Sequence, residues 1–438
     1  MNRLKRIAVG AALMLGITML CGCVMTVDEM YCLPRRSEGY TNLQSVMESA
    51  MGDMAFSAPI SGENQQPVQM ADLNGDGVEE VIVFAKGTQE KPLHIMIFSR
   101  EAENYQLYAA IDTTGTAFDR VDYVQLDDAP GMELIVGRQV QNQILRSLSV
   151  YGFSGSAPER LLTAGYQRYL TCEMNGGDEK KEIVTLGPSA AETDPAAVQV
   201  YAMMRGQLAL AGEARASVPM DQVKRVVSGK LSDGKRAVFV SGDLADEQIQ
   251  TDVFALSPGG VDKVTRSDGE SMSVGKLDGG VILPEDIDHD GRMELPELVA
   301  LHRADQQQQE YAIRWYTLNS QGEDATWQYT YHNFSQGWFL ELDEAAVPRM
   351  CVKQDGDGQY GFYLQEGRDL QKLWTIYVLT GQDRSAQAAQ DYRFVLMKTD
   401  TVVYAGELED AARLMGVNDE QLQQAFHLIQ SDWNTGDF

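Results

Sequence analysis

The sequence predicts an all-β fold with a β-propeller-like repeat architecture of six to seven blades, a short N-terminal helix and C-terminal helices. Two observations support this prediction. Apolar segments with strand-like alternation recur along the 438-residue chain at intervals of about 50 to 62 residues, close to the length of a four-stranded propeller blade with loop insertions. Each copy also follows a turn rich in Asp, Asn and Gly and a shorter apolar run. Because one such unit cannot bury both faces of its sheet, we expect neighbouring units to stack and form the core.

Six copies of the repeat can be aligned. The aligned strand segments are residues 95–98, 150–153, 200–203, 253–256, 315–318 and 376–379. The apolar runs that precede four of them are residues 81–84, 134–136, 183–186 and 237–240. A further strand follows two of them, at residues 105–108 and 327–330. A strand repeat does not fix radial closure, so two β-sandwich-like domains with hairpins of similar size remain an alternative.

The N-terminus has the pattern of an export signal. Residues 1–6 are basic, and the apolar stretch 7–20 has the length of a secretory signal but is short for a transmembrane helix. The Leu-Cys-Gly-Cys motif that ends at Cys23 resembles the bacterial lipobox. The resemblance implies removal of residues 1–22 and a lipid on Cys23, with an ordinary signal peptide or an uncleaved anchor as the alternative. We therefore expect a lipid-anchored protein at the outer face of the bacterial cytoplasmic membrane or in the cell envelope.

The remaining chain divides into four parts. Residues 23–40 are a polar tether, and residues 41–65 hold a short helix, opened by a capping box at Thr41, and a lead-in to the repeats. Residues 66–406 are the β-propeller-like repeat domain. Residues 407–438 are a helical segment, whose apolar face we expect to dock onto the last blade rather than onto another protein.

The chain is strongly acidic, with a formal net charge of -28, while its 44% hydrophobic residues lie in the globular range. Such an anion repels nucleic acid and anionic membrane surfaces. We therefore expect no nucleic-acid partner, and attachment to the membrane through the lipid anchor only. Calcium or a cationic partner is electrostatically favoured, although acidity also serves solubility on its own.

Beyond the lipobox-like motif the cysteines are Cys32, Cys172 and Cys351. This odd and widely spaced set excludes a disulfide-framework domain, but it allows one disulfide whose partners the sequence does not identify. The chain has no CxxC pair, which disfavours structural zinc and thioredoxin-like chemistry.

Two loops have the ligand pattern of a calcium site. Residues 72–80 and 286–294 each place oxygen-bearing side chains at positions one, three, five and nine, and a glycine at position six. This alternation points successive oxygens inward, as a hard cation such as calcium requires. We expect a structural calcium ion, with the carbonyl at position seven as a further ligand. The predicted ligands are Asp72, Asn74, Asp76, Val78 and Glu80 in the first loop, and Asp286, Asp288, Asp290, Arg292 and Glu294 in the second.

These loops resemble those of the FG-GAP and VCBS-type repeat proteins, whose DxNxDGxxD/E loops bind calcium between the strands of a β-propeller. The resemblance covers about residues 66–380. It is degenerate in four other loops, where Asp, Asn and Gly favour a tight turn without a metal. These degenerate loops are residues 125–133, 172–182, 232–234 and 354–358. For the two complete loops a metal-free turn stays open as the alternative.

An EF-hand is a second alternative for residues 286–294, because Glu297 stands at position twelve. The preceding residues 276–285 contain two glycines and a proline, which disfavour the entering helix of an EF-hand. The sequence therefore favours a loop between strands.

No catalytic motif is evident. The five histidines are scattered, and neither HExxH nor GxSxG occurs. The sequence favours, without deciding, a non-enzymatic membrane-anchored extracytoplasmic protein that binds a protein or glycan at the cell surface. Two alternatives remain open: a propeller enzyme (a lyase or glycoside hydrolase) with a carboxylate site in the central channel, and an envelope assembly or signalling lipoprotein.

Overall fold

The computed structural model describes most of the chain after the tether. The described residues are 38–102, 104–140, 146–155, 157–176, 180–188, 194–244, 248–265, 273–275, 281–303, 309–390 and 392–429. Their regular structure is almost entirely strand, arranged in six antiparallel sheets that follow one another along the chain and are here called the first to the sixth sheet. Cys23 and Cys32 lie outside the described residues.

The first three sheets each have four strands in simple up-and-down order, and the first sheet adds a short extra strand at its inner edge. The first sheet contains β1 (Ala55–Phe56), β2 (Val68–Ala71), β3 (Glu80–Lys86), β4 (Leu93–Glu101) and β5 (Asn104–Thr113). The second contains β6 (Ala117–Val124), β7 (Glu133–Gln139), β8 (Arg146–Gly152) and β9 (Glu159–Tyr166). The third contains β10 (Arg168–Cys172), β11 (Glu182–Gly187), β12 (Pro195–Met204) and β13 (Gln207–Pro219).

The last three sheets keep this plan with additions. The fourth contains β14 (Val223–Lys230), β15 (Arg236–Asp243), β16 (Gln248–Ser257), β17 (Gly260–Lys263) and β18 (Ser273–Gly275). The fifth contains β19 (Leu295–Ala300), β20 (Tyr311–Leu318), β21 (Asp324–Asn333), β22 (Trp338–Leu342) and β28 (Phe426–Leu428). The sixth contains β23 (Met350–Gly356), β24 (Gln359–Glu366), β25 (Asp369–Leu379), β26 (Arg393–Lys398) and β27 (Val403–Leu408). Short 3-10 turns are η1 (Met220–Gln222), η3 (Phe334–Gln336) and η4 (Val347–Arg349).

The predicted all-β repeat is confirmed, with one aligned segment in each sheet. These segments fall on β4, β8, β12, β16, β20 and β25. Each is the third strand of its sheet except β20, which is the second strand of the fifth sheet. The reason for this exception is that the strand before the loop is reduced there to a single bridge between Glu285 and Glu294.

The core lies between neighbouring sheets. One apolar cluster joins the first and second sheets, where Phe84 meets Phe118 edge to face with ring centroids 5.0 Å apart. Further clusters join the second to the third sheet, the third to the fourth, the fourth to the fifth and the fifth to the sixth. Each sheet therefore buries its apolar faces mainly against its neighbours, as in other repeat architectures.

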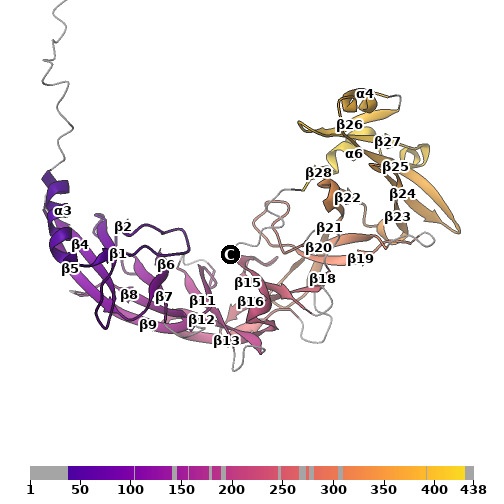
Figure 1. The fold of residues 1–438 in the computed structure, drawn as a ribbon. Coiled ribbons are helices and arrows are strands. Elements are labelled where there is room, and N and C mark those ends of the chain that lie inside the picture. Colours follow the sequence, from indigo (N-terminus) through magenta and orange to yellow (C-terminus); the bar gives the residue numbers. More distant parts are fainter. Residues whose placement is uncertain are drawn as a thin grey trace, which may run out of the picture.

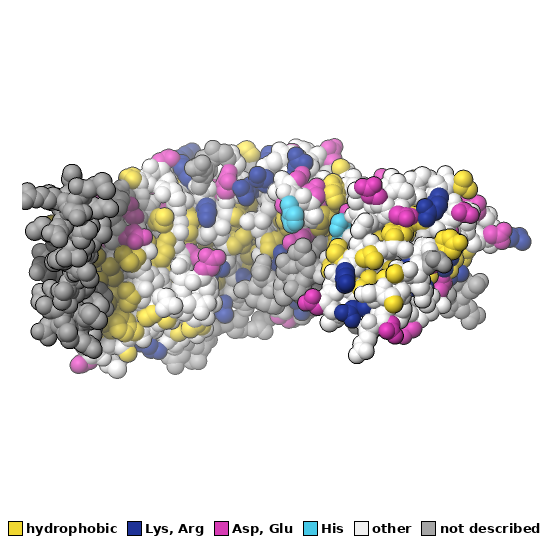
Figure 2. Space-filling view, turned by 90° about the horizontal axis from the view of Figure 1, so that it is seen from above, with side chains coloured by type: hydrophobic (Ala, Val, Ile, Leu, Met, Phe, Trp, Pro, Cys, Tyr) yellow, Lys and Arg dark blue, Asp and Glu magenta, His cyan; other side chains and the backbone are white. Residues whose placement is uncertain are grey.

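The sheets follow an arc in Figure 1, with the first and sixth sheets at its two ends. The first strands of the early sheets, such as β2 and β6, lie toward the inside of the arc, and fourth strands such as β9 and β13 lie toward the outside. Within the described part of the chain, no strand pairing links the first sheet to the sixth. Figure 2 looks into the open side and shows basic side chains in small groups among acidic ones, without a continuous basic patch on this face.

The N-terminal helix α3 (Glu38–Met51) begins before the position that the sequence indicated. Thr41 lies inside the helix, so the predicted capping box at Thr41 is wrong. The apolar face of α3, including Val46 and Met47, packs against the first sheet. Burial of this face positions the helix.

The C-terminal segment differs from the uniform helical prediction. Helices α4 (Arg384–Ala388), α5 (Asp410–Leu414) and α6 (Asp419–Gln424) are short. A capping box between Asn418 and Gln421 opens α6. The expected continuation of this helix is wrong, because residues 426–428 form β28 and pair with β22. Phe426 is buried between the fifth and sixth sheets, and this strand covers the open edge of β22.

Candidate metal centre

The two complete loops occupy equivalent places in the repeat. Residues 72–80 connect β2 to β3, and residues 286–294 lead into β19. The ninth residue of each, Glu80 or Glu294, lies at the start of the following strand and is almost fully buried. The structure therefore places both loops at strand-to-strand turns, and residues 281–285, directly before the second loop, form no helix, unlike an EF-hand.

Both loops also share one backbone path. Positions four and six have a positive φ in each: 74° and 83° at Gly75 and Gly77, and 60° and 85° at His289 and Gly291. A left-handed conformation is costly for residues with a Cβ, which explains the glycine at position six. His289 adopts it without that freedom. At Gly75 a Cβ would lie only 2.2 Å from the backbone of Pro130 in the second sheet's loop.

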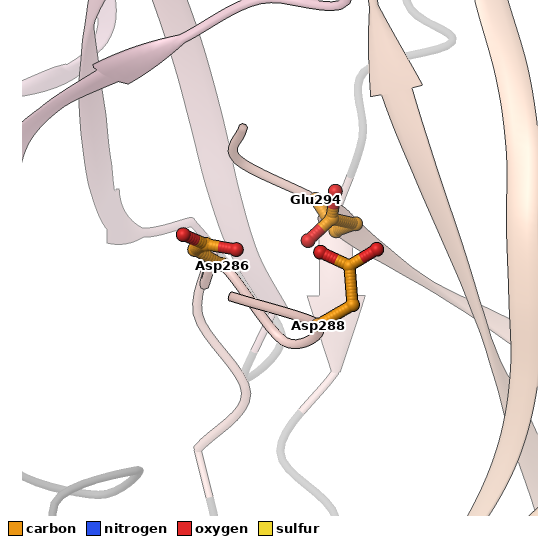
Figure 3. A group of neighbouring side chains, drawn as sticks. All are labelled: Asp286, Asp288 and Glu294. Atoms are coloured by element: carbon orange, nitrogen blue, oxygen red, sulfur yellow. The ribbon is translucent and has the colours of Figure 1, made fainter. Parts of the chain in front are cut away.

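Three carboxylates of the second loop converge on one point. The ligand oxygens of Asp286, Asp288 and Glu294 all lie within 4.8 Å of one another, and they form the only such group of three acidic, histidine or cysteine side chains among the described residues. Figure 3 shows Asp286 facing the other two carboxylates across the loop. Asp286 Oδ2 accepts the Gly291 N–H at 2.9 Å, whereas its buried Oδ1 has no hydrogen-bond donor. This arrangement leaves a negative, unsatisfied point inside the loop.

The pKa of Glu294 reflects the repulsion among these carboxylates. Burial, followed by the charges of Asp288, Asp286 and Asp290, raises the pKa of Glu294 to about 7. One backbone bond acts in the opposite direction, because the Ile287 N–H donates to Glu294 Oε2 at 3.0 Å. A cation at this point would favour the ionised form of Glu294 and remove the cost of bringing the carboxylates together.

One predicted ligand of the second loop, Asp290, binds another partner. The Asp290 carboxylate accepts an Arg292 guanidinium N–H at 3.0 Å and the Arg292 backbone N–H at 2.8 Å. Asp290 therefore lies outside the group of three. The backbone of Arg292 pairs with Lys230 of β14, and the Met293 N–H donates to the Lys230 carbonyl at 3.0 Å. The loop is thus tied to the fourth sheet as well as to the fifth. The carbonyls of Arg292 and Val78 stay predicted ligands.

The first loop binds its acidic side chains through its own hydrogen-bond donors, although burial and the charges of Asp76 and Asp72 still raise the pKa of Glu80. The Asn74 amide donates to Glu80 Oε1 at 2.8 Å and to Asp76 Oδ2 at 3.2 Å. Asp72 accepts the Gly75 and Gly77 N–H groups at 2.7 and 2.9 Å. An amide therefore occupies the interior where the second loop has the carboxylate of Asp288. The predicted ligand set of the first loop would bind an ion only after the Asn74 amide had turned its oxygen inward.

The degenerate loops extend this pattern. In the second sheet the Gln125 amide donates to the carbonyls of Asp127 and Ala129 at 2.9 and 2.5 Å. In the third sheet the Asn175 amide donates to Glu182 Oε1 at 2.5 Å. Both loops thus have a side-chain amide at the place that a cation would need, in agreement with a metal-free turn.

The glutamate that ends four of these loops has a structural role that the calcium-like spacing did not indicate. In each loop the glutamate carboxylate accepts a backbone N–H from the second or third residue of the same loop at 2.6 to 3.0 Å. The pairs are Leu73 with Glu80, Leu126 with Glu133, Met174 with Glu182, and Ile287 with Glu294. A Glu directly before or at the start of each apolar run was the signal that could have identified it.

The remaining degenerate loops hold their acidic residues in hydrogen bonds and ion pairs. Asp233 accepts the Ser320 N–H at 3.1 Å, which links the fourth sheet to the fifth. Asp355 accepts the Tyr363 hydroxyl at 2.7 Å and pairs with Lys372 at 2.9 Å.

Cys172 and Cys351 are buried thiols in β10 and β23, so they do not form a disulfide with each other. None of the helices in the described ranges is long and apolar enough to span a membrane.

Comparison with known proteins gives no family. No family model and no curated protein matches the chain. Solved structures that it resembles over most of its length include the periplasmic gluconolactonase PpgL of Pseudomonas aeruginosa (10% identity, 72% of this chain and 86% of that chain, TM-score 0.30). They also include Sqt1 of Chaetomium thermophilum (9% identity, 80% and 97%, TM-score 0.30) and the rhamnogalacturonan lyase PL11 of Bacillus licheniformis (12% identity, 70% and 71%, TM-score 0.28). Similarity at this level assigns neither a family nor an activity, and the fold described above rests on the strand topology itself.

Proposed function

We propose that the chain is an extracytoplasmic binding protein of the FG-GAP/VCBS-like type, anchored to the bacterial membrane by a lipid on Cys23 and stiffened by calcium in the loop of residues 286–294. The observation that carries the calcium part is the convergence of the Asp286, Asp288 and Glu294 carboxylates on one point, where the buried Oδ1 of Asp286 has no hydrogen-bond donor. The ligand set consists of oxygen alone, which suits a hard cation. Bound calcium would neutralise the three carboxylates and fix the loop between the fourth and fifth sheets.

The calcium part is tested by thermal unfolding of the mature chain in millimolar calcium and in a chelator. Extracellular calcium sites have dissociation constants of roughly 0.1 to 1 mM. Calcium at ten times the dissociation constant adds about 1.4 kcal/mol to the free energy of unfolding. For a chain of this size we expect Tm to rise by about 1 to 3 °C.

A pair of variants makes this test specific. Asp286→Asn keeps an oxygen for the Gly291 N–H but turns an amide toward the site, and we expect the calcium response to vanish. Asp290→Asn is the matched control, because Asp290 faces Arg292 outside the group of three, and the response should persist. An unchanged native Tm in calcium, or a response that survives Asp286→Asn, contradicts the proposed site.

The anchor is tested by metabolic labelling of the expressed chain with a tagged fatty acid. We expect Cys23→Ser to lose the label and to leave the membrane fraction, because the lipobox-like motif attaches the lipid to its final cysteine. Cys21→Ser lies in the same motif and serves as the control, with labelling retained. Equal labelling of native protein and Cys23→Ser would exclude this anchor.

A further inference from the structure

The inside of the arc has a cavity of about 730 Å³ where the second, third and fourth sheets meet. We call it the arginine pocket, after the guanidinium groups that line it. Its charged lining residues are Arg120, Arg146, Arg168, Asp119 and Asp221. Its volume lies in the usual range of small-molecule sites, about 300 to 1,000 Å³. The five residues come from three separate strands and a 3-10 turn, so folding alone brings them together.

A β-bulge builds one wall of the arginine pocket. The register of β6 against β7 shifts between Phe118 and Val121, and this places Asp119 and Arg120 in the irregular stretch. Bulges redirect side chains and are common beside functional sites. The lead-in segment reinforces this stretch, because the Ser61 N–H and hydroxyl both donate to the Asp119 carbonyl, at 2.8 and 3.0 Å.

Hydrogen bonds hold two of the guanidinium groups in fixed positions. Arg120 donates to Asp122 Oδ2 at 2.9 Å and lies over the Tyr169 ring, 4.9 Å from its centroid. Arg146 donates to the Gln167 carbonyl at 3.1 Å and lies 3.4 Å from Asp119 Oδ1. Such fixed donors lose little side-chain entropy when a ligand binds.

The aspartates beside these arginines are held by buried tyrosines. The Tyr166 hydroxyl donates to Asp119 Oδ2, and the Tyr169 hydroxyl donates to Asp122 Oδ2, both at 2.6 Å. The two tyrosine rings pack edge to face, 5.1 Å apart. Burial of both rings makes this support rigid, so each guanidinium keeps its direction without a ligand.

Arg168 is the third guanidinium and the one that we select for testing. Its Nη1 donates to the Lys224 carbonyl of the fourth sheet at 3.1 Å. Burial, and then repulsion from Arg146, lowers the pKa of Arg168. An anion bound between Arg146 and Arg168 would remove that repulsion and would accept charge-assisted hydrogen bonds.

The charge balance limits the anion that fits. Three arginines and two aspartates line the arginine pocket, and Asp122, which pairs with Arg120, brings the local charge close to zero in a chain whose net charge is -28. A polyanion would be repelled by the whole protein, whereas a single carboxylate brings one charge that the guanidinium N–H groups can bind. Ser61, Gln167 and the exposed Asp221 add polar side chains that suit ligand hydroxyls.

We propose that the arginine pocket binds a hydroxylated organic acid with one carboxylate, either as a free sugar acid or as the acidic end of a short oligosaccharide. This inference rests on the proposed role as a binding protein and names the ligand class of that role. It does not depend on calcium, because the loop of residues 286–294 contributes no residue to the arginine pocket.

Titration calorimetry of the mature chain in detergent tests the proposal. The probes are glucuronate, a disaccharide that ends in glucuronate, neutral glucose and inorganic phosphate. We expect glucuronate to bind at least about tenfold more tightly than glucose or phosphate, since a charge-assisted bond contributes about 1.5 to 3 kcal/mol. Tighter binding of the disaccharide assigns the oligosaccharide source, and equal binding assigns the free acid.

Three variants separate recognition from folding. Arg168→Gln should weaken glucuronate binding at least about tenfold, and Arg168→Lys should weaken it less because the charge remains. Arg160→Gln is the matched control, because Arg160 is exposed on the outer strand β9, and it should bind as the native chain does. Absence of glucuronate binding, equal binding of glucose or phosphate, or full binding by Arg168→Gln overturns the proposal. The calcium shift in Tm, recorded on the same samples, shows separately whether the metal part of the proposed function fails.

Discussion

The loops of residues 72–80 and 286–294 have the same backbone path, and in both burial and neighbouring aspartates raise the pKa of the closing glutamate, but the side chain at position three differs. At position three the first loop has Asn74, whose amide donates to Glu80. The second loop has Asp288 there, whose carboxylate faces Asp286 and Glu294. One amide in place of one carboxylate thus separates a loop with an internal side-chain hydrogen bond from a loop in which three carboxylates converge. The comparison teaches that a calcium-like spacing alone does not decide whether a metal is needed.

The next two loops along the arc agree with this interpretation. Gln125 and Asn175 each supply an amide to the interior of their loop. The repeat therefore keeps the turn and its glutamate while it varies the group at the centre. Four predictions follow the same contrast, from the largest expected effect to the smallest.

The first prediction concerns the glutamates that hold the loops. Glu80→Ala leaves the Leu73 N–H and the Asn74 amide without their acceptor, so we expect a loss of about 1 to 3 kcal/mol in chelator. Glu294→Ala leaves only the Ile287 N–H without its acceptor, so its loss should be smaller. Urea unfolding of both variants measures the difference. An equal or larger loss in Glu294→Ala would remove the distinction between the loops.

The second prediction concerns pH. The pKa of Glu294 is raised to about 7, above its ordinary value of 4.5, so the folded protein binds the proton more tightly than the unfolded chain. This contribution to stability is complete below pH 4.5 and is lost as the pH rises through 7. In chelator we expect the free energy of unfolding, measured relative to Glu294→Gln, to fall by on the order of 1 to 2 kcal/mol between pH 5 and 8. A flat difference between the two proteins would show that Glu294 is ionised throughout.

The third prediction converts the second loop into the first. In Asp288→Asn the new amide donates to Glu294 as Asn74 donates to Glu80. We expect the metal-free protein to gain about 1 kcal/mol and its calcium response to disappear. Thermal unfolding with and without calcium measures both effects, and a calcium response of native size in Asp288→Asn would refute the comparison.

The fourth prediction is the reverse change. Asn74→Asp removes the internal amide and adds a carboxylate beside Asp72 and Glu80. We expect a loss of about 0.5 kcal/mol or more in chelator, regained in calcium. Glu79→Gln is the control, because Glu79 is exposed in the same loop and lies outside the predicted ligand set, and its stability should not respond to calcium. If calcium does not restore the stability of Asn74→Asp, the first loop cannot be made into a site by one charge.

The fold was largely predictable because strand repeats have a strong period. The aligned segments fall on equivalent strands, and the loop positions follow from Asp, Asn and Gly spacing. The sequence predicted the acidic ligands as a set and gave Asp290 and Asp288 the same role. In the structure Asp290 accepts a hydrogen bond from Arg292, whereas Asp288 belongs to the group of three carboxylates. The strand β28 was not predictable, because the spacing of Leu422, Ala425 and Phe426 also fits a helix, and the open edge of β22 decided the outcome.

The sequence by itself determined the strand period, the turn chemistry and the acidity of the chain, because these depend on neighbouring residues and on total composition. Only the tertiary structure decided which carboxylates share one point and which arginines share one cavity. Arg120, Arg146 and Arg168 are more than twenty residues apart in the chain, and their meeting depends on how the second and third sheets pack. The physical reason is that the interaction between two charges depends on their distance in space. The spacing of residues along the chain fixes that distance only within a single turn.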